Sequence, residues 1–191
     1  MIDSTPKNSF DKLLIFDKNN FSDWNHLNDT IMGGKSEAQC RVTSQGLLLE
    51  GNLVEDGGGF VSCRSPVLSP PINLSNYVGL ELVLEGYGRT FKFGASSEVK
   101  NLLFSRFIPF GLKWIISFPT ESNGTTVIKI PFSSLEPVIR AKPVRLPVSF
   151  NSSSITQFQL LYSKFGKPGK MNTSFQEGPL RVLIKSINAY K

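Results

Sequence analysis

The chain has few of the residues on which enzyme active sites depend. It has one histidine, His26, and two cysteines, Cys40 and Cys63, among 191 residues. No serine or cysteine stands at a recognisable spacing from His26 to form a nucleophile–base pair. A metal-ligand cluster, a Gly-x-Ser-x-Gly motif and a dinucleotide fingerprint are also lacking. We therefore predict a protein that is not an enzyme, with no catalytic residues, no metal and no cofactor.

Long apolar runs and targeting patterns are missing as well. No run is long enough to span a bilayer, and the segment 1–7 has neither an apolar signal region nor an Arg-rich pattern. These absences predict a soluble protein, cytoplasmic in a bacterium, or in the matrix or stroma as a mature organellar form. In such a compartment Cys40 and Cys63 are expected to remain buried free thiols, with pairing across neighbouring strands as the alternative.

Basic residues outnumber acidic ones, but they form no consecutive block. The net charge is +6; residues 1–95 hold 8 Lys and Arg against 11 Asp and Glu, and residues 96–191 hold 13 against 4. The missing block argues against nucleic acid as a partner. The basic C-terminal half is interpreted either as peripheral contact with an anionic membrane or as an ordinary solvated surface.

The composition favours β-structure. The chain has 15 Phe, 16 Gly and 12 Pro, and helical periodicity is weak throughout. We predict an all-β fold, a single-domain antiparallel β-sandwich of jelly-roll type spanning 13–191 after an N-terminal extension, 1–12. The predicted strands lie at 13–16, 38–43, 47–50, 60–64, 79–85, 90–94, 102–107, 113–118, 125–131, 156–163 and 180–190.

The most specified stretch is 24–36, which we interpret as a loop of defined shape. Gly-Gly permits backbone with positive φ and close approach of a neighbouring segment, and Asn and Asp side chains satisfy loop amides. The indole of the tryptophan is expected to cover an apolar surface while its N–H finds one partner. Its candidate partner- or ligand-binding residues are Trp24, Asn28, Asp29, Met32, Gly33, Gly34 and Ser36.

These residues open a series of ordered motifs that resembles the complex I intermediate-associated protein 30 family. The resemblance covers the chain from about residue 13 to its end, and an acidic residue is more usual in the family at the position of Tyr87. It implies a galactose-binding-like β-sandwich that assists assembly of respiratory or photosynthetic complexes. The matching blocks are Trp24 to Ser36, Gly51 to Arg64, Gly86 to Phe91, Ile130 to Arg140 and Ile187 to Tyr190.

Two roles are open for these motifs. The stretch 24–36 either plugs one end of the sandwich or recognises a partner, with a small-ligand site as a third interpretation. Phe60 belongs to the second block, where Arg64 also lies. Arg64 and Arg89 are expected to pair with a carboxylate such as that of Asp29 or Glu85, or else to offer two guanidinium groups to a carboxylate or phosphate.

Residues 102–118 are the most apolar part of the chain. They form either two core strands joined by a turn or an apolar loop that projects Phe107, Phe110 and Trp114 onto a membrane or a hydrophobic client. With the resemblance, these observations predict a non-enzymatic assembly factor. It would bind protein subunits of a membrane electron-transfer complex: respiratory complex I, an NAD(P)H dehydrogenase or a photosystem. The alternative is a carbohydrate- or small-ligand-binding module on the same fold.

Overall fold

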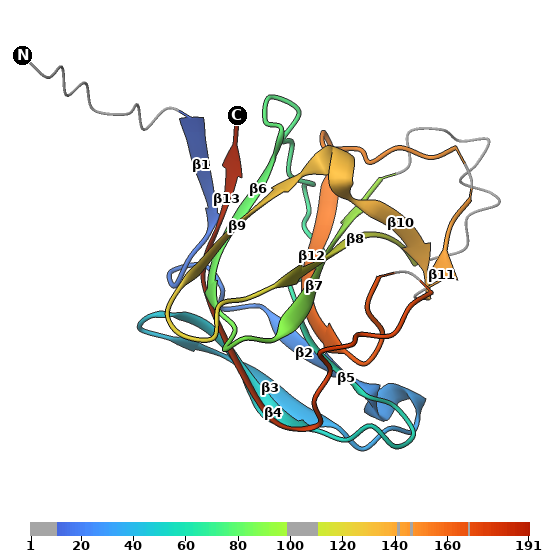
Figure 1. Ribbon diagram of the computed structural model, residues 1–191. Helices are drawn as coiled ribbons and strands as arrows, with labels where there is room; N and C mark the ends of the chain where they lie inside the picture. Colours follow the sequence, from blue (N-terminus) through green and yellow to red (C-terminus); the bar gives the residue numbers. More distant parts are fainter. Residues whose placement is uncertain (1–10, 99–110, 141, 146, 168) are drawn as a thin grey trace, which may run out of the picture.

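The computed structural model describes residues 11–98, 111–140, 142–145, 147–167 and 169–191. Their strands form two antiparallel sheets that pack face to face (Figure 1). The predicted antiparallel β-sandwich is thus confirmed. No helix in these ranges is long and apolar enough to cross a membrane.

The first sheet has six strands, in the order β3-β4-β13-β6-β9, with β1 also paired to β13. Its long central strand, β13, pairs with β4 along its first half, with β1 along its second half, and with β6 on its other side. The bounds are β1 (Lys12–Phe16), β3 (Glu37–Thr43), β4 (Gly46–Leu53), β6 (Gly79–Glu85), β9 (Thr126–Pro131) and β13 (Gly178–Tyr190).

The second sheet has seven strands, in the order β11-β10-β8-β7-β12-β5-β2. Two short 3-10 turns, η2 (Asp29–Met32) and η3 (Phe132–Ser134), are the helical elements of the described residues. The strand bounds are β2 (Asn25–Asn28), β5 (Phe60–Arg64), β7 (Thr90–Ser97), β8 (Leu112–Pro119), β10 (Glu136–Ile139), β11 (Lys142–Pro143) and β12 (Ile155–Ser163).

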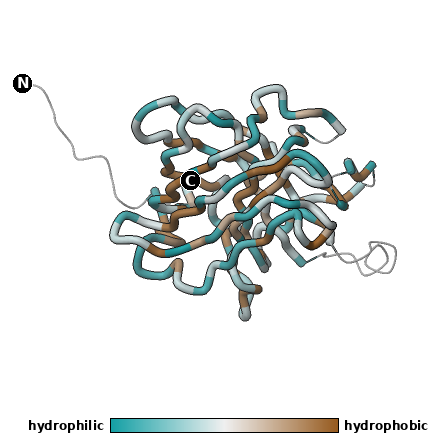
Figure 2. The backbone as a smooth tube through the Cα atoms, turned by 90° about the horizontal axis from the view of Figure 1, so that it is seen from below, coloured by the Kyte–Doolittle hydropathy of each residue, from teal (hydrophilic) through white to brown (hydrophobic). Residues whose placement is uncertain are grey.

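The core lies between the two sheets. Successive residues of a strand point to opposite faces, so every second side chain, often leucine or phenylalanine, points into the space between the layers. Figure 2 shows apolar segments in the interior and hydrophilic ones along most outer loops. The largest fully buried side chains of the core include those of Phe21, Phe91, Phe93, Phe158, Tyr162, Leu80 and Leu82.

Several sequence expectations need correction. The stretch 24–36 is not one loop, because it contains the edge strand β2 and the turn η2. The strands β10 and β11 were not predicted, and the strand predicted at 102–107 lies outside the described residues.

The two cysteines are not free thiols. Cys40 points inward from β3 and Cys63 from β5, and their Cα atoms lie 6.1 Å apart. They form a disulfide that joins the two sheets near one edge of the sandwich. Two inward-facing positions on strands of opposite layers brought the sulfur atoms together, which spacing in the sequence could not reveal.

Candidate functional site

The buried carboxylate of Asp29 organises one end of the sandwich. Asp29 is fully buried and opens η2, while β2 ends one residue before it. Its Oδ1 accepts the backbone N–H of Ser36 at 2.9 Å. Its Oδ2 accepts the Ser36 hydroxyl at 2.6 Å and the N–H groups of Gly59 and Phe60 at 2.6 and 3.2 Å. The first and second sequence blocks are therefore tied together by one side chain.

The protonation of Asp29 follows from this arrangement. Burial raises the pKa of its carboxyl, but the hydrogen bonds from the Ser36 hydroxyl and from the backbone of Gly59, Ser36 and Phe60 outweigh it. The pKa is therefore lower than its ordinary value, and Asp29 is ionised at neutral pH. A carboxylate whose lone pairs are used in this way is a structural acceptor.

Two glycines make room for this carboxylate. A Cβ on Gly34 or on Gly58 would overlap the Asp29 side chain. Gly33 ends η2 with a left-handed φ of 86°, which glycine adopts without strain. The double glycine and the later glycine run of the family blocks thus both make room for the hydrogen-bonded Asp29 side chain.

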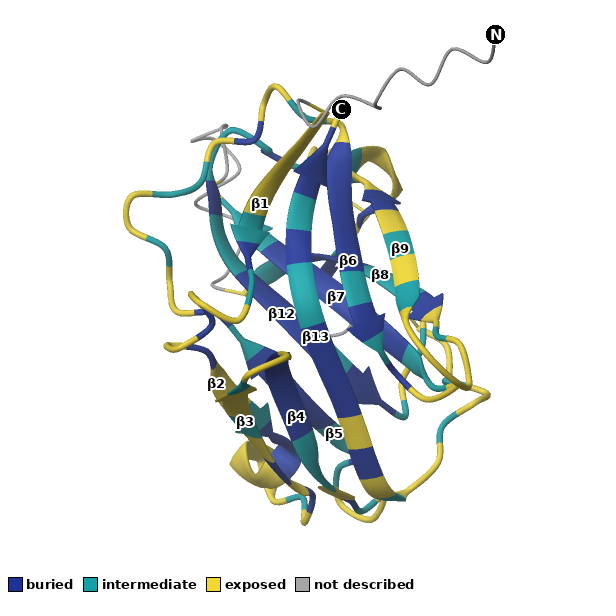
Figure 3. Cartoon of the chain, turned by 90° about the vertical axis from the view of Figure 1, so that its left-hand side faces the viewer, coloured by how far each residue is buried: buried dark blue, intermediate teal, exposed yellow. Residues whose placement is uncertain are grey.

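The turn that begins at Asp29 exposes two large apolar side chains. Ile31 and Met32 are 65% and 72% exposed, although Asp29 in the same turn is fully buried. The turn beside β2 and β3 stands out as exposed at the edge of the fold (Figure 3). Close by, Lys35 Nζ forms an exposed ion pair with Asp56 at 2.9 Å. We call Ile31 and Met32 the apolar tip. The ion pair of Lys35 and Asp56 lies beside it, and the hydrogen bonds of Asp29 hold the turn in place.

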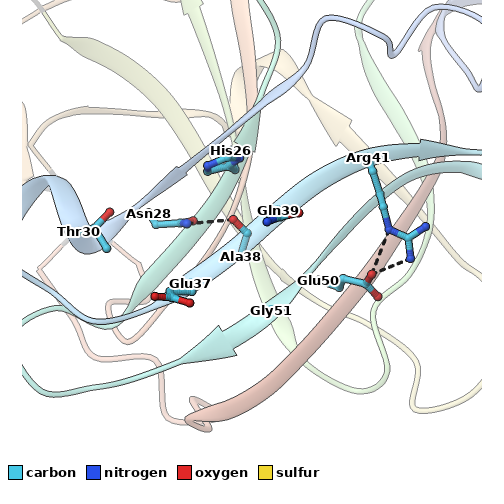
Figure 4. A pocket seen from close by; sticks show the side chains of 9 residues that line it. All are labelled: His26, Asn28, Thr30, Glu37, Ala38, Gln39, Arg41, Glu50 and Gly51. Atoms are coloured by element: carbon cyan, nitrogen blue, oxygen red, sulfur yellow. Dashed lines mark hydrogen bonds and ion pairs between the residues drawn. The ribbon is translucent and has the colours of Figure 1, made fainter.

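A polar pocket of about 470 Å³ adjoins this turn, where the edge strands of the two sheets meet (Figure 4). Asn28 donates from Nδ2 to the carbonyl oxygen of Ala38 at 2.9 Å, which links β2 to β3. Its Oδ1 is buried and accepts no hydrogen bond from the described residues. The lining residues are His26, Asn28, Thr30, Glu37, Ala38, Gln39, Arg41, Glu50 and Gly51.

Two of the charged side chains that line the pocket pair with each other. The Arg41 guanidinium donates to Glu50 Oε1 at 2.6 Å from Nη2, and the two side chains form one wall (Figure 4). His26 on β2 and Glu37 on β3 are exposed. The pocket therefore offers an exposed imidazole and an exposed carboxylate to a ligand.

Other predicted site residues belong to the core. Trp24 is 4% exposed and packs edge-on against Phe16 and Phe21, at centroid distances of 5.3 and 5.4 Å. Its indole N–H, expected to have a partner, has none among the described residues. Trp114 is also 4% exposed and packs on Phe150, so its projection onto a client is wrong. Phe107 and Phe110 lie outside the described residues.

The two arginines differ from the expected carboxylate pairing. The guanidinium of Arg89 donates to the Tyr162 hydroxyl at 3.0 Å and to the carbonyl oxygens of Gln176 and Pro179, both at 2.8 Å. It thus holds the segment that leads into β13. Arg64 makes no ion pair with any described carboxylate.

The structure therefore divides the predicted residues. One group comes together at one end of the sandwich: Asn28, Asp29, Met32, Gly33, Gly34, Ser36 and the backbone of Phe60. The side chains of Trp24, Arg89 and Trp114 do not form a surface. Ile31 in the turn was missed, and so were the pocket residues His26, Glu37 and Gln39. Ile31 could have been found, because an apolar residue beside Met32 in a turn followed by two glycines has little core to enter.

The two layers and their strand order define an antiparallel β-sandwich, a fold that solved carbohydrate-binding modules share. Within this fold class, the chain belongs to the complex I intermediate-associated protein 30 family, whose model matches residues 14–184.

Individual relatives are distant. The uncharacterized protein C9E9.15 of Schizosaccharomyces pombe is 26% identical over 143 residues, which is 70% of this chain and 58% of that protein. The chain therefore spans little more than half the length of this curated relative.

Solved structures share the fold at low identity. The family 11 carbohydrate-binding module of the Clostridium thermocellum cellulase Lic26A-Cel5E has a TM-score of 0.64 and 14% identity, with 94% of each chain covered. A family 11 module from Clostridium thermocellum is also known in complex with a β-1,3-1,4-mixed-linked tetrasaccharide. The family 30 module of Cel9D-Cel44B from Clostridium thermocellum has a TM-score of 0.55 and 15% identity, covering 94% of this chain and 97% of the module.

Proposed function

We propose that the protein is a non-enzymatic assembly factor that binds a subunit or intermediate of a membrane electron-transfer complex. Membership of the complex I intermediate-associated protein 30 family supports an association with complex I assembly. Respiratory complex I, an NAD(P)H dehydrogenase and a photosystem are the complexes in question.

One observation carries the proposal at the level of residues. Ile31 and Met32 expose apolar side chains on a turn whose base is fixed by Asp29. A fixed base lowers the entropic cost of binding, and methionine adapts to apolar surfaces of varied shape. This tip fits an apolar groove on a partly assembled subunit.

The test is affinity capture from membranes of the source cells, with the captured subunits identified by mass spectrometry. We expect the wild-type chain to enrich subunits of one electron-transfer complex and the double variant I31S/M32S to lose them. The matched control is V127S, which removes an apolar side chain that is 58% exposed on β9. Equal enrichment by I31S/M32S and V127S would refute a role for the tip.

The pocket beside the turn favours a second candidate function, the binding of a saccharide. His26 and Glu37 offer an exposed imidazole and an exposed carboxylate to ligand hydroxyls at this site, which Asn28 also lines. The related fold of carbohydrate-binding modules supports this interpretation.

Calorimetric titration with a β-1,3-1,4-mixed-linked tetrasaccharide tests the second candidate. We expect H26A to weaken binding while the melting temperature stays unchanged, because His26 is exposed on an edge strand. The control D56A alters an exposed charge outside the pocket. Absence of saturable heat with the wild-type chain would exclude this ligand.

A further inference from the structure

The outer face of the seven-stranded sheet carries three basic side chains. Lys92 stands between Phe91 and Phe93, which are fully buried in the core, so alternation places it on the opposite face. Lys113, before the buried Trp114, and Arg64, after the buried Cys63, face the same way.

Strand register brings these residues around one position without a side chain. Arg64 is opposite Gln159 on β12, which is opposite Gly94 on β7, and Gly94 is opposite Ile115 on β8. Lys92 lies two residues before Gly94 on its strand, and Lys113 lies two residues before Ile115 on its own. The cations therefore approach Gly94 from three sides.

Hydrogen bonds fix the polar part of this face. Lys113 Nζ donates to Oε1 of Gln159, so its side chain extends across the Gly94 row. Nε2 of Gln159 donates to the Ser62 hydroxyl at 2.8 Å, and that hydroxyl donates to the carbonyl oxygen of Leu27 at 2.8 Å. The acceptor of Gln159 is thus occupied by Lys113, whereas Arg64 beside it has no carboxylate among the described residues.

Charge on this face is not balanced within the described residues. Their four ion pairs involve Lys12, Lys35, Arg41 and Lys185, and none of the three cations of this face. Lys92 is 5% exposed, and the Ser117 hydroxyl opposite it is buried without a hydrogen-bond partner. The acidic side chain on the Gly94 row is Glu136, which is exposed at β10 beside Ile115.

Unpaired cations are costly to bury, so their retention needs a reason. Burial lowers the pKa of Lys92 to about 8. Burial, followed by repulsion from Arg64, lowers the pKa of Lys113. An anion between them would relieve both costs, because it supplies the missing opposite charge.

We propose that this face binds the oxyanion of a small ligand, a carboxylate or a phosphate, between Arg64, Lys92 and Lys113. The guanidinium of Arg64 matches two oxygens of such a group. Arg64 and Lys113 are partly exposed, so the ligand enters from their side. This site is separate from the turn and the pocket, and it stands or falls independently of them.

The experiment is calorimetric titration at constant ionic strength with inorganic phosphate and with D-glucuronate, and with D-glucose as the neutral match. We expect saturable binding of at least one anion and none of glucose. R64Q and K113M should each weaken it about tenfold or more, since a hydrogen bond to a charged group is lost. The matched control R181Q removes an exposed charge from β13 of the other sheet and should leave affinity within about twofold.

The two anions separate the sources of the oxyanion. Binding of phosphate alone identifies a phosphate ligand, and binding of glucuronate alone identifies a carboxylate. R64K should bind with intermediate affinity, because it keeps the charge and loses the paired N–H groups; it also serves if R64Q fails to fold. No saturable binding of either anion, or equal binding by R64Q, K113M and R181Q, would overturn the proposal.

Discussion

At the scale of single residues, the structure assigns opposite tasks to neighbours in one motif. Asp29 holds four hydrogen bonds inside the fold, while Ile31 and Met32 two and three positions later face solvent. The sequence marked the stretch as specified but could not separate these tasks. The partners of Asp29 that fix its role, Gly59 and Phe60, lie about thirty residues away.

Replacing Asp29 by asparagine is expected to destabilise the fold by about 3 kcal/mol, because an amide would turn a donor toward N–H and O–H groups. The pKa of Asp29 is lowered in the folded protein, so its contribution is complete above the ordinary value of 3.8 and is lost as pH falls through the folded pKa. Urea denaturation at pH 7 measures the change. D56N, at an exposed ion pair, is the control, and equal stability of D29N and wild type would contradict the assignment.

Lys92 is expected to lower the stability of the fold at neutral pH. Its pKa is about 8 when folded and 10.5 ordinarily, so the cost is complete below pH 8 and vanishes as pH rises to 10.5. Its cross-strand neighbours, Ser117 and Leu161, do not titrate in this range.

Replacement of Lys92 by methionine should therefore raise the free energy of unfolding at pH 7 by about 3 kcal/mol, at about 1.4 kcal/mol per pKa unit. The advantage of K92M over wild type should shrink between pH 8 and pH 10.5 in urea denaturation. An advantage that stays constant over this range would show that methionine acts by packing alone.

At the scale of strands, local pattern predicted the elements that carry their own signal. The strands at 60–64 and 79–85 have the predicted bounds. The expected hairpin turn joins β3 to β4, although its Gly46 already pairs with Thr43 as the first residue of β4. The strand β2 has no alternation of its own and forms because it pairs with β5. The face of β13 switches at a bulge between Ile184 and Ser186, which a strict alternation missed.

The disulfide of β3 and β5 is expected to stabilise the sandwich. It closes a loop with a sequence separation of 23 residues, for which chain entropy predicts about 3 kcal/mol. The double variant C40A/C63A should lose this amount in urea denaturation. The same variant should be insensitive to a reducing agent, whereas the wild type should lose stability on reduction. A wild type unaffected by reduction would refute the contribution.

At the scale of the whole molecule, the basic C-terminal half of the sequence is not a half of the structure. Its strands are divided between the sheets, with β12 in one and β13 in the other. Peripheral membrane contact through these residues, which stays a proposal, would therefore depend on the summed electric field of dispersed charges and not on one basic patch.

Association with vesicles that contain an anionic lipid is accordingly expected to be weak and to fall as NaCl rises from about 50 to 500 mM. Sedimentation of the protein with the vesicles measures it. Neutral vesicles provide the control. Association that does not change with salt would point to apolar insertion and would remove charge from the mechanism.

The position of β13 has a consequence for how the protein is made. It is the shared partner of β1, β4 and β6, yet it is the last strand in chain order. At a synthesis rate of about 5–20 residues per second, β4 waits on the order of ten seconds for its partner after it leaves the ribosome. During that interval Leu47, Leu48 and Leu49 are without the strand that later covers their edge. A protein proposed to bind unfinished assemblies thus passes through an unfinished form of its own, in which the edge of β4 is open to another strand.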